Sequence, residues 1–178
     1  MQWLDILKNK KQIHYFSNRT VDKQFIVDIL DELHEYCPSK QNKTPYTIKV
    51  VPSEGNESLK EAIFYNTWCY SPSPSDPRNT QVLAPYTLLF KATTSEPIGM
   101  IEIGIASIFI AYAAISRGLS IGFCECYKKD NIDLMLGIGY PIVGDETFYH
   151  PLQKKKKQHH FEEEEPKKQD SSEYILWV

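Results

Sequence analysis

The sequence predicts an α+β sandwich in which helices flank a mixed, mainly antiparallel sheet. Three observations support this fold class. Amphipathic helices come first, strands separated by helices follow, and one helix in the middle of the chain is apolar on every side. The chain has 178 residues, of which 42% are hydrophobic and 24% are charged. These values are ordinary for one globular domain and exclude a disordered or fibrous chain.

Net charge and cysteine content limit which classes of function and which cellular compartment we expect for the protein. The 20 basic and 23 acidic residues leave a net charge of −3, which argues against a nucleic-acid-binding protein because such proteins carry a basic excess. The four cysteines form no C-x-x-C pair, and the first residues, MQWLDILKNKKQ, hold no signal-peptide core. We therefore expect a cytoplasmic protein with free thiols.

Two helices and a strand are predicted first. Gln2–Asn9 forms a short helix with several apolar residues. Val21–Cys37 forms an amphipathic helix because its apolar residues recur at spacings of three and four; Thr20 is its N-cap and Pro38 ends it. A polar loop then leads into the strand Tyr46–Val51.

Helices and strands alternate in the middle of the chain. Glu57–Trp68 is a second amphipathic helix, and Tyr70–Asn79, with its three prolines, is a loop. Tyr86–Ala92 is a strand rich in leucine and aromatic residues. Pro97–Ser116 is the long apolar helix, and Gly118 stands at its C′ position.

The next stretch completes the predicted core. Leu119–Tyr127 is a strand, Asp130–Leu136 is a short helix, and Gly137–Pro141 is the last core strand. We assign residues 1–152 to this domain.

Residues 153–178 form a C-terminal arm. The arm is polar until Tyr174–Val178, which reads YILWV and forms a compact apolar strand. A polar stretch that ends in an apolar strand needs something to receive that strand. The sheet edge of a partner subunit is one receiver, and the chain's own sheet is the other, which periodicity supports almost equally.

The segment Ile98–Ile115 raises a membrane alternative, because its eighteen residues hold one charge, Glu102. That length is the lower limit for a membrane-spanning helix. Glu96-Pro97 before the segment and Arg117-Gly118 after it are helix start and stop signals, and a helix apolar on all sides is also typical of a protein core. We expect a core helix and no membrane.

Catalytic and metal signatures are missing from the sequence. No G-x-S-x-G, H-E-x-x-H or G-x-x-x-x-G-K-[ST] occurs. Cys124 and Cys126 lie on one side of a strand, where two thiols alone hold a metal weakly, so we expect small residues facing a cavity and no metal. The basic cluster after the first helix is either a solvated turn or an anion site. It consists of Lys8, Lys10, Lys11 and His14.

The loop from Cys37 to Tyr46 carries the first resemblance to a known family. It reads C-P-S-K-Q-N-K-T-P-Y and leads into TIKVV. It resembles the A-P-S-x-x-N-x-Q-P-W motif that precedes a strand in the FMN-dependent nitroreductases. Loops of this kind offer N–H and amide groups to a ligand.

Further stretches are similar to the same family, in the same order along the chain. Lys10, Gln12 and His14 stand where the family has an R-x-S-x-R/K element that holds the FMN phosphate, ribityl chain and pyrimidine edge. Ala114–Tyr127 resembles the end of the family's central helix, A-x-x-x-G-L-G-S-C-W-I-G-G-F. The other similar stretches are Gln81–Tyr86, Gly137–Pro141 and Pro166–Gln169.

The resemblance implies a homodimer with its apolar helix at the centre and FMN in the interface. It implies an NAD(P)H oxidoreductase in which hydride passes by a ping-pong mechanism through flavin N5 to a nitroaromatic, a quinone or a similar small acceptor. No side chain is expected to be a catalytic acid or base, and the backbone of Glu125 and Cys126 would approach N5. The cofactor-binding residues that the resemblance implies are Lys10, Gln12, His14, Pro38, Ser39, Lys40, Asn42, Asn79, Cys124, Glu125, Cys126, Lys167 and Lys168.

The chain departs from the family at three of these positions. Lys10 replaces arginine and loses its bidentate fork on phosphate, Gln12 replaces serine, and Glu125 replaces a small residue near N5. These departures keep an alternative open, in which a dimer of the same fold binds flavin weakly or not at all and acts as a binding or structural protein. The loop Tyr70–Asn79 stands where larger members cover the substrate pocket with a helical insertion.

Overall fold

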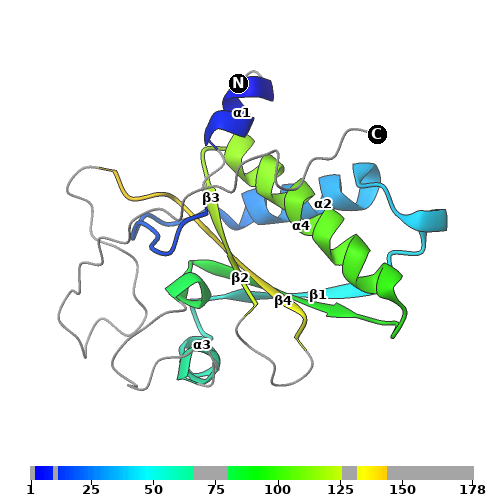
Figure 1. The fold of residues 1–178 in the computed structure, drawn as a ribbon. Helices are drawn as coiled ribbons and strands as arrows, with labels where there is room; N and C mark the ends of the chain where they lie inside the picture. Colours follow the sequence, from blue (N-terminus) through cyan, green and yellow to red (C-terminus); the bar gives the residue numbers. More distant parts are fainter. Residues whose placement is uncertain (1–2, 10–11, 66–79, 126–131, 144–178) are drawn as a thin grey trace, which may run out of the picture.

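A four-stranded sheet flanked by helices forms the centre of the protein (Figure 1), seen here in a computed structural model that describes residues 3–9, 12–65, 80–125 and 132–143. The strands are β1 (Tyr46–Pro52), β2 (Tyr86–Ala92), β3 (Ser120–Cys124) and β4 (Leu134–Gly139). Their order in the sheet is β1-β2-β4-β3, and each of these three pairings is antiparallel. The predicted α+β class is confirmed.

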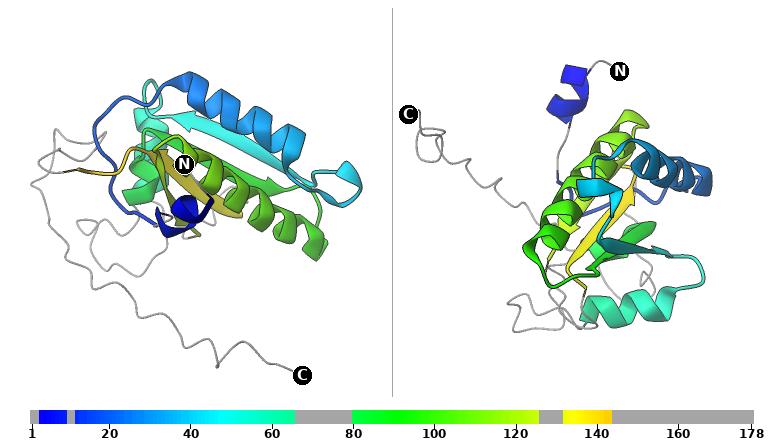
Figure 2. Two further views of the ribbon diagram at one scale, coloured as in Figure 1. Left: turned by 90° about the horizontal axis from the view of Figure 1, so that it is seen from above. Right: turned by 90° about the vertical axis from the view of Figure 1, so that its right-hand side faces the viewer.

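Helices cover both faces of this sheet. Helices α2 (Lys23–Tyr36) and α4 (Pro97–Ser116) lie on one face, and α3 (Glu57–Tyr65) lies on the other (Figures 1 and 2). The short helix α1 (Trp3–Asn9) lies beside the end of α4. Two 3-10 helices that the sequence did not predict precede strands β1 and β2: η1 (Lys40–Asn42) and η2 (Thr80–Leu83).

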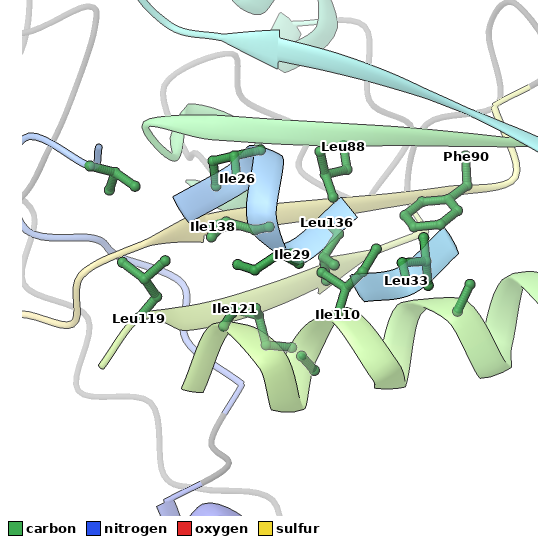
Figure 3. Packing of buried hydrophobic residues seen from close by; sticks show 14 of the residues in the cluster. Ile26, Ile29, Leu33, Leu88, Phe90, Ile110, Leu119, Ile121, Leu136 and Ile138 are labelled. Carbon is green, nitrogen blue, oxygen red and sulfur yellow. The ribbon is translucent and has the colours of Figure 1, made fainter. Parts of the chain in front are cut away.

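The alternation of side chains along the strands divides the core into two clusters. The larger cluster lies between the sheet and helices α2 and α4 (Figure 3). Its members include Ile29, Leu88, Phe90, Ile110, Leu136 and Ile138. The smaller cluster lies on the face of α3 and consists of Val51, Leu89, Cys124 and Met135, with Leu59 and Ile132 packed against it. Cys124 is therefore a core residue, and its sulfur belongs to the α3 side.

The N-terminus of α2 corrects one prediction. The helix begins at Lys23, and its N-cap is Asp22 rather than Thr20. The Asp22 carboxylate accepts a hydrogen bond from the backbone N–H of Gln24 at 2.8 Å, which satisfies one of the free donors of the first turn. The predicted end before Pro38 is confirmed, because α2 stops at Tyr36.

The segment before β4 corrects a second prediction. The helix predicted over Asp130–Leu136 is wrong, because its last three residues belong to β4. Asp133 N–H donates to the carbonyl of Phe90 at 2.9 Å, and the Asp133 carboxylate accepts from Ala92 N–H at 2.7 Å. Since both partners are on β2, pairing with a distant strand overrides the local pattern.

Helix α4 has the predicted bounds, and Gly118 follows it in the left-handed conformation at φ +77°. The helix is long and apolar enough to cross a membrane by length and composition, but 56% of its apolar window is buried inside the fold. Arg117 fixes its end to α2 through a bidentate ion pair with Glu32, at 2.5 and 3.1 Å. Helix α4 is a core helix in this structure.

Three predictions lie outside the described residues. These are the loop Tyr70–Asn79, the arm of residues 153–178 and the terminal strand Tyr174–Val178. Helix α3 begins at the predicted Glu57 and is described as far as Tyr65.

A fully buried lysine, Lys60, donates a hydrogen bond to the turn before β2. Lys60 of α3 is 0% exposed, and its ammonium nitrogen donates to the carbonyl of Ala84. The same carbonyl accepts from the Ser53 hydroxyl at 2.8 Å. Burial lowers the pKa of Lys60 from 10.5 to about 7, because the charged form loses its hydration inside the protein.

The ionisation of Lys60 makes the stability of the fold depend on pH. Between pH 7 and 10.5 the unfolded chain binds a proton at Lys60 that the folded chain does not, so the free energy of unfolding rises with pH in that window. Below pH 7 the cost of burial is fully present. We expect Lys60→Met to raise the free energy of unfolding at pH 7 by roughly 2 kcal/mol, and this gain to shrink as pH approaches 10.5.

Chemical denaturation at a series of pH values measures this effect. Lys49→Met is the matched control, because it makes the same chemical change at an exposed lysine on β1. A gain in Lys60→Met that stays constant from pH 6 to pH 10 would contradict the prediction.

Candidate functional site

The segment after α1 lies along the outer side of β3. Gln12 forms a parallel bridge with Ile121, and Ile13 N–H donates to the Ile121 carbonyl at 3.0 Å. The Gln12 side chain adds a bond from Nε2 to the Phe123 carbonyl at 3.3 Å. The described part of the N-terminal motif is therefore fixed beside the strand that leads to Cys124 and Glu125.

A pair of glycines allows this close approach. Gly122 of β3 and Gly137 of β4 face each other in the sheet. A Cβ atom on Gly122 would lie 2.3 Å from the Ile13 carbonyl oxygen, and one on Gly137 would lie 2.2 Å from the Gln81 carbonyl oxygen. Any side chain at either position would push the N-terminal segment or η2 off the sheet.

Gln81 joins these two segments. It lies in η2 and is 4% exposed, and its amide nitrogen Nε2 donates to His14 Nδ1 at 2.9 Å. Its carbonyl oxygen Oε1 is buried and has no hydrogen-bond partner among the described residues. Sequence reasoning did not select Gln81 as a site residue; it had only placed it in the motif before the second strand.

The end of β3 completes this group. Cys124 is buried and Glu125 is exposed directly after it. The structure therefore brings together Gln12, His14 and the end of β3, which the sequence had placed in one site. Lys10, Asn79, Cys126, Lys167 and Lys168 lie outside the described residues, so their places in the site stay predictions.

The loop before β1 forms a second group, held by a buried carboxylate of α4. Glu102 is 3% exposed and accepts from the Ser39 hydroxyl at 2.6 Å and from Lys40 N–H at 2.7 Å. The Ser39 hydroxyl oxygen in turn accepts from Thr44 N–H at 2.9 Å. Sequence reasoning missed Glu102 as a site residue, although a single carboxylate in an apolar helix was the available signal.

Internal hydrogen bonds occupy the backbone of this loop. Asn42 N–H donates to the Ser39 carbonyl and Lys43 N–H donates to the Lys40 carbonyl, at 3.1 and 3.2 Å. The expected contact of backbone N–H groups with a ligand is therefore not available at these positions or at Lys40 and Thr44. The exposed side chains of Lys40, Asn42 and Lys43 are what this part of the loop presents to a ligand.

The backbone of the loop is strained. Gln41, Asn42 and Thr44 have positive φ values of 57°, 53° and 39°. Asparagine tolerates this region, but a β-branched threonine there is a true outlier. Strain of this kind persists only where the surroundings enforce it, and here the bonds to Glu102 and Ser39 do so.

Two titratable groups beside Glu102 are held neutral. Burial raises the pKa of the Cys37 thiol, and the Glu102 carboxylate raises it further. Burial raises the pKa of Tyr46 to about 12, with added effects of Cys37 and Glu102. The loop group therefore offers amide and lysine side chains but no thiolate or phenolate near neutral pH.

The two groups lie on opposite sides of the molecule. In Figure 1 the loop with η1 is beside the start of α4, at one end of the molecule, and the blue segment that follows α1 is at the opposite end. From Glu102 to the end of α4 at Ser116 the helix rises about 20 Å, at 1.5 Å per residue. One chain therefore does not bring all the predicted site residues together.

Comparison with known proteins identifies the fold. No family model and no curated protein matches the sequence. A nitroreductase family protein from Clostridium novyi NT matches the structure with a TM-score of 0.65 at 23% identity, over 79% of this chain and 87% of that one. The FMN and NADPH-dependent nitroreductase NfnB from Sphigopyxis sp. strain HMH matches with a TM-score of 0.70 at 15% identity, over 100% and 99% of the two chains. The chain has the nitroreductase fold, as its motifs had indicated.

Removal of the Glu102 carboxylate is expected to release the loop. Glu102→Ala leaves the Ser39 hydroxyl and Lys40 N–H without their acceptor, so the free energy of unfolding falls by about 2 kcal/mol. Glu102→Gln keeps one carbonyl acceptor and loses about half as much. Urea denaturation measures both values.

Glu96→Ala is the matched control, at the N-cap residue just before the same helix. Glu96 is exposed, and its side chain makes no cap hydrogen bond, so its removal is expected to cost under about 0.5 kcal/mol. Equal losses for Glu96→Ala and Glu102→Ala would rule out the role assigned to Glu102.

Proposed function

We propose that the protein is an FMN-dependent NAD(P)H oxidoreductase of the nitroreductase type and acts as a homodimer. The observation that carries this proposal is the nitroreductase fold, in which Gln12, His14 and the end of β3 form one group. The structural neighbours include proteins described as FMN-dependent nitroreductases, one of them NADPH-dependent. Nitroaromatics, quinones and similar small molecules are the proposed acceptors.

The residues of the first group suit a flavin nucleotide. His14 and Gln12 offer nitrogen donors and acceptors, and Gln81 Oε1 is a buried acceptor that still needs a donor. Lys10, Lys167 and Lys168 are the proposed phosphate ligands, since ammonium groups bind phosphate as point charges. The backbone at Glu125 and Cys126 is the proposed neighbour of flavin N5. When bound, FMN would supply hydride transfer between the nicotinamide donor and the acceptor.

The chain's own residues would bind and orient the cofactor rather than act as acids or bases. A backbone bond joins the N-terminal segment to β3, and η2 packs closely on Gly122 and Gly137, so the three segments form a rigid binding surface for the cofactor. The Glu125 carboxylate is exposed, so its charge is hydrated in the described structure.

A second copy of the chain would complete the site. Because the loop group and the N-terminal group lie on opposite sides of one chain, Lys40 and Asn42 can reach the flavin only from a partner. The outer face of α4 fits such a partner, since Met100, Ile101 and Ile105 are 50%, 57% and 40% exposed. Exposed apolar side chains on a helix that is otherwise core indicate a protein interface.

The sheet also offers an edge to the partner. The outer side of β3 is occupied by Gln12, whereas β1 has no strand on its outer side among the described residues. We therefore assign β1 as the edge that receives the C-terminal strand Tyr174–Val178 of the other subunit.

One observation favours the alternative of a dimer that binds flavin weakly or not at all. Gln12 donates one amide hydrogen to the Phe123 carbonyl. In the loop before β1, protein acceptors already bind the backbone N–H groups of Lys40, Asn42, Lys43 and Thr44. Both features reduce the donors available to a cofactor. In this case the dimer acts as a binding or structural protein.

Flavin absorbance of the purified protein decides between the two functions. After loading with FMN and desalting, we expect about one flavin per chain, with bands near 375 and 450 nm that bleach on addition of NADH or NADPH (a property of the cofactor). His14→Ala is expected to weaken FMN binding about tenfold, because it removes one polar contact. His34→Ala, an exposed histidine on α2, is the matched control. A colourless protein after loading would favour the alternative.

A charge on the outer face of α4 is expected to break the dimer. Ile101→Lys places an ammonium group in the proposed interface, so the dimer dissociation constant rises at least about 100-fold. Sedimentation equilibrium measures the mass without detergent. Val27→Lys, on the exposed side of α2, serves as the control and stays dimeric. A wild-type chain that sediments as a monomer at micromolar concentration would exclude the homodimer.

A further inference from the structure

Gln81 carries a buried acceptor that the protein itself does not satisfy. The residue is 4% exposed, its Nε2 is bonded to His14, and its Oε1 has no partner among the described residues. Buried polar atoms in native proteins are nearly always paired, because they have lost their bonds to water. An orphaned acceptor next to a proposed cofactor site points to a ligand that supplies the missing donor.

The surroundings of Gln81 hold this acceptor in place. A Cβ atom on Gly122 would lie 2.6 Å from Gln81 Cγ, so the side chain packs directly on the strand backbone. The Gln81 carbonyl accepts from Ala84 N–H at 3.2 Å, and the Ala84 carbonyl is bonded to Ser53 and Lys60. The backbone and Cγ of Gln81 are therefore held against the strands, and the bond to His14 sets the direction of its amide.

The bond to His14 fixes the chemistry of the pair. Because an amide nitrogen only donates, His14 Nδ1 accepts the hydrogen bond from Gln81 Nε2, which corresponds to the ring tautomer that carries its proton on Nε2. The amide of Gln81 then presents its oxygen, which is an acceptor only. A phosphate group does not suit this oxygen, because it is anionic and has no proton to give to a neutral amide. A neutral O–H or N–H donor does.

We propose that Gln81 is a cofactor-binding residue that accepts a hydrogen bond from a neutral donor of the flavin, either a ribityl hydroxyl or the imide N3–H. This assignment rests on the proposed function. It adds to the site a residue that holds the polyol or ring part of the ligand, separate from the lysines proposed for the phosphate. Through its bond to His14, Gln81 also sets which nitrogen of that ring donates.

The first test compares Gln81→Met with Gln24→Met. Gln24 is exposed on α2, so the control makes the same chemical change away from the site. Titration by flavin fluorescence is expected to give FMN binding about tenfold weaker for Gln81→Met and unchanged binding for Gln24→Met. Without flavin, the melting temperature of Gln81→Met is expected to stay close to that of the wild type, because the removal of an unpaired acceptor offsets the loss of the bond to His14. A merely structural glutamine would instead lower it.

The second test compares flavin analogues on the wild-type protein. It can therefore refute the proposal even if Gln81→Met does not fold. Wild-type protein is titrated with FMN against 3-methyl-FMN, which lacks the N3–H, and with riboflavin against lumiflavin, which lacks the ribityl chain. We expect one of these pairs to differ by about tenfold in the wild type, which identifies the donor, and to differ less in Gln81→Met. Gln81→Leu repeats the comparison with a different apolar side chain.

The outcomes separate this inference from the proposed function. Wild-type protein that binds no flavin overturns both. Wild-type protein that binds FMN, with Gln81→Met binding it equally well, overturns the role of Gln81 and leaves the oxidoreductase proposal intact. Equal affinities within both ligand pairs in the wild type also overturn the role of Gln81.

Discussion

The packing of α4 across one face of the sheet is the contact on which the rest of the structure depends. Ile103, Ala106 and Ile110 are buried against the apolar side chains of the strands, and the small residues of the helix let it approach closely. The same helix carries Glu102, which holds the loop before β1, and exposes Met100 and Ile101 on its outer side. One helix thus connects the core, the loop and the proposed dimer surface.

Hydrogen bonds from the loop before β1 stabilise the buried carboxylate of Glu102 in that helix. A buried carboxylate is costly unless donors surround it, and the chain provides the Ser39 hydroxyl and the Lys40 N–H. Those bonds in turn keep Thr44 in a conformation that it would not adopt alone. The carboxylate and the strained loop therefore stabilise each other, and the exposed loop side chains acquire a fixed position.

A pair of glycines positions the other group of polar residues, beside β3 and η2. Gly122 and Gly137 leave a flat area of backbone on which Ile13 and Gln81 rest. This contact brings His14 and Gln81 together, although they are far apart in sequence. The two groups of polar residues are held in place but separated by most of the length of α4, which is the physical reason for the proposal that a second chain completes the site.

Local sequence patterns determined the helices and most of the strands. Runs of apolar residues predicted the bounds of β2 and α4, and Pro97 and Gly118 marked the two ends of α4. The resemblance of the motifs to a known family indicated the fold. Only the tertiary structure decided that residues 134–136 pair with β2, that Glu102 binds the loop, and that Gln81 meets His14. Periodicity and capping act between residues a few positions apart, so a sequence displays them. Hydrogen bonds between residues tens of positions apart depend on which segments the fold brings together, and no local pattern encodes that choice.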